Sequence, residues 1–139
     1  MTYKFLEHTA DIKIGVEGKS LANAFKSSAL ALREVMFHKE KIKVKSKLKK
    51  VLKVTGKDKD ALLYNFLEEF LYLLDAENFV FSKILSLKID AGEGSLVAEV
   101  WGDRASNYKF RNEVKAITYN EMFVRESGGK VKLQFVLDV

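Results

Sequence analysis

The chain has no cysteine and no proline among its 139 residues, and it has a single tryptophan. The lack of cysteine excludes disulfides, thiolate metal sites and cysteine nucleophiles, so any bound metal ion must use oxygen or imidazole ligands. No apolar run approaches the roughly 20 residues that span a bilayer, and the first eleven residues lack the basic-then-apolar order of a secretory signal. We therefore expect a cytoplasmic protein.

The balance of residue types is that of a folded, soluble protein. Hydrophobic residues make up 47% of the chain and charged residues 31%. Disordered chains carry too little apolar surface to offset the conformational entropy lost on folding. The length suits one compact unit, so we expect a single domain over residues 1–139.

The net charge of +5 is concentrated in one segment. Residues 39–53 contain eight lysines and one glutamate, which leaves −2 for the remainder of the chain. Lysine alternates with aliphatic residues and serine over residues 41–49, which predicts a strand with its lysines facing water. Such lysines protect an edge strand from unwanted pairing, or they contact RNA phosphates through Lys43, Lys45 and Lys47. No aromatic residue interleaves the lysines, as a base-stacking platform would require.

Hydrophobic periodicity predicts a mixed α and β protein. Two turn sequences, AGEG and SGG, are typical of hairpins and favour antiparallel pairing in the C-terminal half. We expect an α+β fold in which two helices pack on one mixed, mostly antiparallel β-sheet in a single two-layer domain. Trp101 is expected to pack in the core or at a sheet edge. The expected elements are strands at 3–6 and 12–17, a helix from an N-cap at Ser20 to Phe37, a second helix from Asp58 or Asp60 to Asp75, and strands at 79–89, 96–101, 114–124 and 131–139.

The segment EHTADI interrupts the start of a β structure with a histidine and an aspartate. From these residues alone His8 and Asp11 form a turn, an acid–base pair or a metal pair. At the other end of the chain, Asp138 and the α-carboxylate of Val139 follow an apolar strand. If that strand pairs with the N-terminal strands, three carboxylates converge on one rim, and a divalent cation such as calcium or magnesium would offset their repulsion.

A second polar segment is NEVKAITYNEM, which is expected to form a strand. Alternation predicts that Glu113 and Lys115 share one face of that strand. The pair is then either an ordinary surface ion pair, which contributes little to stability, or a contact for a phosphate or an acidic group on a partner.

Catalytic templates are absent from the sequence. We find no glycine-rich phosphate loop, no His-Glu-x-x-His helix and no Gly-x-Ser-x-Gly elbow. Without a nucleophile paired with a base, we do not expect an enzyme.

Five segments taken together resemble the archease family. They are FLEHTADI, GKSLANAF, LLYNFLEEFLYL, EVKAITY and the closing LDV. They occur in the family's order over Tyr3 to Val139, so the resemblance covers essentially the whole chain. The pair HTAD and EVKAxTY is specific, whereas either segment alone would be weak.

The resemblance implies a function as a helper rather than a catalyst. Archeases assist the guanylylating tRNA-splicing RNA ligase of the RtcB type by promoting its guanylylation and turnover and by broadening its nucleotide use. The alternative role is that of an RNA-binding chaperone or modulator of a tRNA cytosine methyltransferase, which here would use the lysine-rich segment 39–53.

The resemblance also implies roles for particular residues. A calcium site would comprise Asp11, Asp138 and Val139, and ligase activation would depend on Asp11, Lys115 and Asp138. His8 would orient its loop, and Glu113 would support Lys115. The sequence departs from the family at two positions, where Lys13 replaces a common glycine and Asn120 a common histidine; an asparagine neither titrates near neutral pH nor ligates strongly.

Overall fold

The structure, a computed structural model, describes residues 2–6, 11–38, 42 and 48–139. Within these residues the chain forms two α-helices, a short 3-10 turn and seven strands. In chain order they are β1 (Thr2–Leu6), β2 (Ile12–Gly18), α1 (Leu21–Met36), β3 (Leu48–Thr55), α2 (Lys59–Glu77), β4 (Phe79–Asp90), β5 (Ser95–Arg104), η2 (Ala105–Asn107), β6 (Ala116–Ser127) and β7 (Lys130–Asp138).

The α+β class is confirmed, but the expected single sheet is two sheets. One has the strand order β1-β2-β7-β6 and the other β3-β5-β4, and each of these described pairings is antiparallel. The division follows from the connection between β5 and β6, residues 105–115, which carries the chain from one sheet to the other. Hairpin signals specify neighbours along the chain and cannot specify which sheet a hairpin joins.

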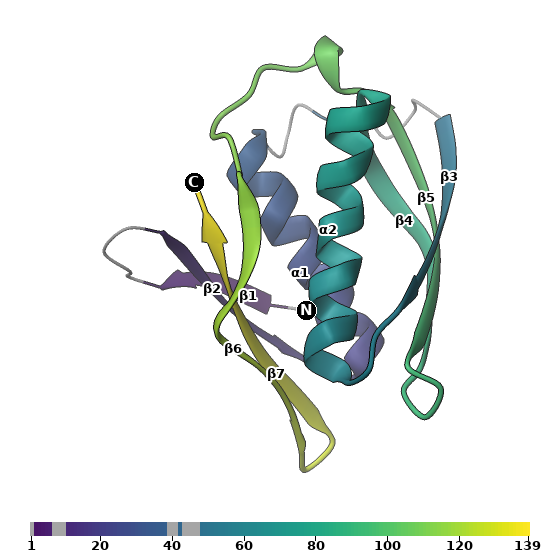
Figure 1. The fold of residues 1–139 in the computed structure, drawn as a ribbon, viewed down its shortest axis with the longest axis vertical. Helices are drawn as coiled ribbons and strands as arrows, with labels where there is room; N and C mark the ends of the chain where they lie inside the picture. Colours follow the sequence, from purple (N-terminus) through teal and green to yellow (C-terminus); the bar gives the residue numbers. More distant parts are fainter. Residues whose placement is uncertain (1, 7–10, 39–41, 43–47) are drawn as a thin grey trace.

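Figure 1 shows both helices between the two sheets, so the expected two-layer arrangement is also corrected. Each helix contacts strands of both sheets. The core between them is apolar and includes fully buried Phe25, Phe66 and Phe135, contributed by α1, α2 and β7. Neither described helix is both long enough and apolar enough to cross a membrane.

Both helices begin where the sequence predicts. The side chain of Ser20 accepts a hydrogen bond from the backbone N–H of Asn23 at 3.1 Å, and Asp58 accepts one from Ala61 at 2.7 Å. These oxygens satisfy backbone donors that have no partner inside the helix. The second helix runs past Asp75 to Glu77 and ends at Asn78, which adopts a left-handed conformation.

Within the lysine-rich segment, residues 48–53 belong to a strand. Strand β3 starts at Leu48 and continues to Thr55, two residues beyond the lysine-rich segment 39–53. Leu48, expected on the core face, is 49% exposed, whereas Leu52 and Val54 are buried. Lys43, Lys45 and Lys47 lie outside the described residues.

The two hairpins form as the turn sequences predict. Ser127 pairs with Lys130 across a two-residue turn in which Gly128 and Gly129 both have positive φ, 59° and 74°. Of the two turn types that match the twist of the strands at this loop length, type I′ has positive φ at both central residues, which glycine adopts without steric cost.

Candidate functional site

The two ends of the chain meet on strand β7. This strand lies between β2 and β6, and its register with β2 pairs Ile12 with Leu137. Asp11 directly precedes Ile12 and Asp138 directly follows Leu137, so the two aspartates lie at the same end of this strand pair. Both aspartates are partly buried.

Lys115 joins the same edge through its backbone. Its N–H donates to the carbonyl of Asp138 at 2.7 Å, and the next residue, Ala116, is paired with Asp138 in the sheet. This contact fixes Lys115 beside the end of β7 while its side chain is exposed. The edge therefore brings Asp11, Lys115 and Asp138 together from three separate parts of the sequence.

The expected strand at 114–124 starts later than predicted. Strand β6 begins at Ala116, so Glu113 and Lys115 precede it and do not share a strand face. Both side chains are exposed. Ile117, the second residue of β6, is buried, at 2% exposure.

The residues at this edge suit a hard cation. Two carboxylates at one end of a strand pair repel each other, and a bound divalent ion removes that cost. Val139, 37% exposed, directly follows Asp138. All these donors are oxygens, which calcium and magnesium prefer. No three side chains of His, Cys, Asp and Glu within residues 2–6, 11–38, 42 and 48–139 are grouped to hold a metal, and His8 lies outside these residues.

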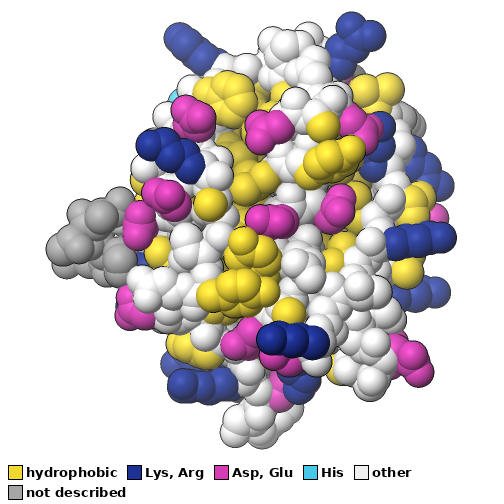
Figure 2. Space-filling view, viewed as in Figure 1, with side chains coloured by type: hydrophobic (Ala, Val, Ile, Leu, Met, Phe, Trp, Pro, Cys, Tyr) yellow, Lys and Arg dark blue, Asp and Glu magenta, His cyan; other side chains and the backbone are white. Residues whose placement is uncertain are grey.

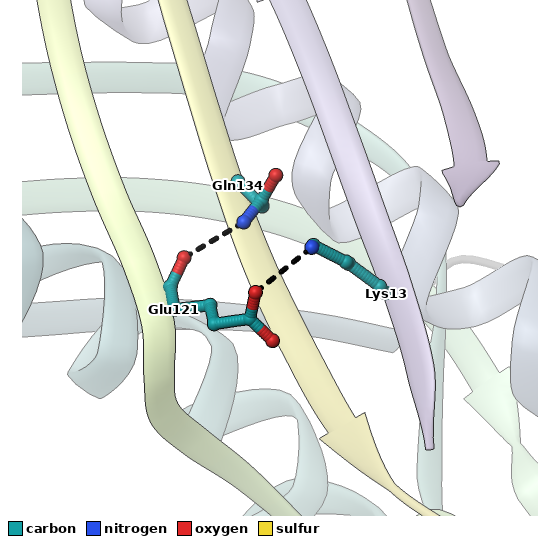
Figure 3. A network of polar contacts seen from close by, with 3 residues as sticks. All are labelled: Lys13, Glu121 and Gln134. Atoms are coloured by element: carbon teal, nitrogen blue, oxygen red, sulfur yellow. Dashed lines mark hydrogen bonds and ion pairs between the residues drawn. The ribbon is translucent and has the colours of Figure 1, made fainter. Parts of the chain in front are cut away.

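Next to the aspartates, a four-residue bulge interrupts β6. Thr118 pairs with Val136 and Phe123 with Gln134, so residues 119–122 face a single residue of β7. Glu121 has a φ of 57°, in the left-handed region. Figure 3 shows its two anchors: its carbonyl accepts from Nε2 of Gln134 at 2.8 Å, and its carboxylate pairs with Nζ of Lys13 at 3.0 Å.

The Lys13–Glu121 ion pair was not predicted from the sequence. Lys13, in β2, lies two residues after Asp11, which directly precedes that strand. Nothing in local periodicity links it to Glu121, which is 108 residues away. The sequence offers one signal, which is the break in polar–apolar alternation at Asn120 and Glu121; in the structure Tyr119, Asn120 and Glu121 are consecutive exposed residues.

Comparisons with known proteins give the same relationship for the whole chain. A profile described as the Archease protein family (MTH1598/TM1083) matches residues 3–139. The chain belongs to the archease family. Archeases of Sulfurisphaera tokodaii and Pyrococcus furiosus are 37% and 38% identical to it, in alignments that cover 99% of this chain and 98% of each relative.

Solved structures of archease relatives have the same fold. The solution structure of Methanobacterium thermoautotrophicum protein 1598 superposes with a TM-score of 0.82 at 30% identity, covering 99% of this chain and 98% of that one. A crystal structure from Thermotoga maritima, described as an archease and possible chaperone, gives a TM-score of 0.67 at 20% identity over 98% and 96% of the two chains. The fold of this chain, with its two sheets, is therefore similar over its whole length to the folds of these two solved structures.

Proposed function

We propose that this archease is a non-enzymatic, cytoplasmic activator of a tRNA-splicing RNA ligase of the RtcB type. It would promote guanylylation and turnover of the ligase and broaden its nucleotide use. Membership of the family supports the partner, and the meeting of Asp11, Lys115 and Asp138 at one sheet edge supports the site. That convergence is the observation on which the proposal depends.

The chemistry of this edge suits contact with a charged reaction centre. Asp11, Asp138 and the carboxylate of Val139 would hold a calcium ion, which supplies a positive charge to a phosphate or carboxylate oxygen when bound. The exposed ammonium of Lys115 would pair with a phosphate or with an acidic side chain of the ligase. The Lys115 backbone bond to Asp138 keeps this cation and the two carboxylates on one rigid edge.

An activator of this kind must distinguish two states of its partner. A contact made equally with both states of the ligase shifts no equilibrium, however tight it is. We therefore propose that the edge binds more tightly to the ligase conformation that accepts guanylate. Asp11 and Asp138 would position the calcium ion at this edge. Lys115 would neutralise a phosphate or an acidic side chain that the ligase presents only in this conformation.

Ligation assays with the cognate ligase test the proposal. Asp11→Asn, Asp138→Asn and Lys115→Ala should each reduce the stimulation of multiple-turnover ligation and of guanylylation by at least about tenfold, that is, about 1.4 kcal/mol. Asp75→Asn and Lys109→Ala change exposed residues elsewhere and serve as charge-matched controls. Full stimulation by all three site variants would reject the proposal.

The alternative role, an RNA-binding chaperone or modulator of a tRNA methyltransferase, stays a prediction. It was assigned to Lys43, Lys45 and Lys47, which lie outside the described residues. Charge reversal at these three lysines that leaves RNA binding and its salt dependence unchanged would remove it, because phosphate contacts weaken as salt rises.

A further inference from the structure

The outer face of the three-stranded sheet carries two rows in which lysines flank an apolar residue. In the register of β3, β5 and β4, Trp101 lies between Lys49 and Lys83. Four residues along β3, a second row places Val97 between two further lysines, Lys53 and Lys88. We call these six residues the lysine–tryptophan face.

These six residues point away from the helices. Most of their neighbours along the strands, such as Leu52, Ala98 and Val100, are buried, and alternation in a strand sends the next residue to the opposite face. Trp101 is partly exposed and Val97 is 44% exposed. In Figure 1 the helices lie on the inner side of this sheet only, and Figure 2 shows basic side chains along the margin over β3, β4 and β5.

Two bulges in β4 produce this arrangement. The register shifts between Phe81 and Lys83, and again between Ile84 and Ser86. Without the first bulge the strict two-residue period would turn Lys83 toward the core instead of placing it beside Trp101. Polar contacts hold the first bulge, because Arg33 donates to the carbonyls of Phe81 and Ser82, and the Ser82 hydroxyl donates to the carbonyl of Trp101 at 3.1 Å.

Protection of sheet edges explains part of this pattern. Strands β3 and β4 are the edges of the sheet, and edge lysines discourage pairing with other chains. Edge protection does not call for an aromatic ring on the central strand between two lysines. Residues 39–53 contain no aromatic residue between their lysines. In the sheet, strand β5 places Trp101 beside Lys49.

We propose that the lysine–tryptophan face binds a single strand of nucleic acid. Trp101 would stack on one base, and the lysines on either side would contact phosphates, the combination by which proteins bind single strands without reading sequence. The two rows lie about 13 Å apart along the strands, and the lysines of each row about 10 Å apart across them. Four lysines outnumber the one acidic residue between the rows, Glu99, which pairs with Lys49 at 3.4 Å. This inference does not depend on ligase activation.

The single tryptophan provides a direct measurement. Titration of the whole protein with a 12-nucleotide oligouridylate should quench Trp101 fluorescence in a saturable manner, because a stacked base contacts the indole ring. Inorganic polyphosphate carries phosphates without bases and should bind with no quenching. Oligouridylate that binds without quenching, or that does not bind at all, would overturn the proposal.

Variants separate this face from general basicity. Anisotropy of a fluorescein-labelled oligouridylate, read at several salt concentrations, should show Lys53→Gln/Lys88→Gln weakening binding at least about tenfold and lowering the magnitude of the salt slope by about 1.4, since each phosphate contact on a single strand contributes about 0.7. Lys130→Gln/Lys132→Gln removes the same charge from the other sheet and should retain most of the affinity. An equal loss in this control would overturn the proposal. Trp101→Phe keeps a ring and should bind more tightly than Trp101→Leu; equal affinities would overturn base stacking.

Discussion

The rings of Tyr64 on α2 and Tyr119 on β6 stack nearly parallel, with centroids 4.2 Å apart and 4° between their planes. Tyr119 is the first residue of the four-residue bulge, so this stack attaches the bulge to the helix. An aromatic pair contributes about 0.5–1.5 kcal/mol beyond its buried area. The stack therefore helps to fix the segment that carries Glu121 beside the acidic edge, by which we mean Asp11 and Asp138 at the end of the β2–β7 pair.

Ionisation of Tyr64 and Tyr119 should make the protein less stable at alkaline pH. Burial, and then the neighbouring Glu68, raise the pKa of Tyr64; burial, and then Asp58, Glu68 and Asp60, raise the pKa of Tyr119. Because the folded-state pKa lies above the unfolded value of about 10, this contribution to stability is complete below pH 10 and is lost as pH rises above it. Urea unfolding at about pH 9 and about pH 11 should show a smaller loss of stability for Tyr64→Phe and Tyr119→Phe than for the parent chain.

The control for this effect is Tyr72→Phe, which removes an exposed hydroxyl from the same helix outside the stack. Lysines titrate in the same pH range, but all these chains share them, so the difference between chains isolates the tyrosines. A loss in Tyr64→Phe and Tyr119→Phe equal to that of the parent would contradict the expectation.

Arg33 should be a major source of stability. Its Nη1 donates to the carbonyls of Phe81 and Ser82 at 3.1 and 2.9 Å, and its guanidinium lies 4.7 Å from the Phe81 ring centroid. Burial lowers the pKa of Arg33, which reflects the cost of holding a cation there. Arg33→Met should reduce the free energy of unfolding by about 1–3 kcal/mol, because two carbonyls lose their charged donor. Chemical denaturation measures this, and Lys26→Met on the same helix is the control; an equal effect of the two would contradict it.

Local sequence signals predicted the elements better than their assembly. Ser20 was identified as a cap, and Asp58 as one of two candidates with Asp60, because capping requires only a side-chain oxygen and a neighbouring N–H. The turns after β4 and β6 were likewise specified by their glycines. By contrast, alternation reports which face a residue occupies and not which strand lies beside it. For this reason one sheet was expected where the structure has two. Trp101 was expected to pack in the core or at a sheet edge, but it lies between two lysines on the outer face of the central strand.

The part of the candidate site that the sequence predicted is the part formed by its two ends, Asp11 and Asp138. Acidic residues beside two apolar strands suggested that Asp11 and Asp138 would meet, and the pairing of β2 with β7 places both at the same end of that strand pair. Their roles in metal binding and ligase activation stay predictions. The bulge at residues 119–122 was not predictable, because its position depends on a tertiary contact with Lys13 and on the stack with Tyr64.

Calcium binding should depend on the paired aspartates. Titration calorimetry with calcium chloride should detect one site, and Asp11→Asn or Asp138→Asn should weaken it at least about tenfold, or about 1.4 kcal/mol. Each substitution keeps the size of the side chain and removes one charged oxygen ligand. Asp75→Asn removes an exposed carboxylate from α2 and should leave affinity unchanged. Equal weakening by all three variants would indicate general electrostatics and contradict a site at this edge.

The Lys13–Glu121 ion pair should control the affinity of the acidic edge. The Lys13 side chain is 19% exposed, and its ammonium is held at 3.0 Å from the Glu121 carboxylate. Without that partner the ammonium is attracted to Asp11, two residues away along the chain, where it competes with a cation. Glu121→Gln should therefore weaken calcium binding about threefold to tenfold, as expected for one charge at about 7 Å in a partly solvated site.

A double-mutant cycle distinguishes this competition from the loss of a nearby negative charge. Lys13→Gln should strengthen calcium binding, because it removes the competing cation. Adding Glu121→Gln to Lys13→Gln should then have little further effect, since Glu121 acts through Lys13. If Glu121→Gln weakens binding equally with and without Lys13, its carboxylate acts on the ion directly. The ion pair would in that case stabilise the bulge without regulating the site.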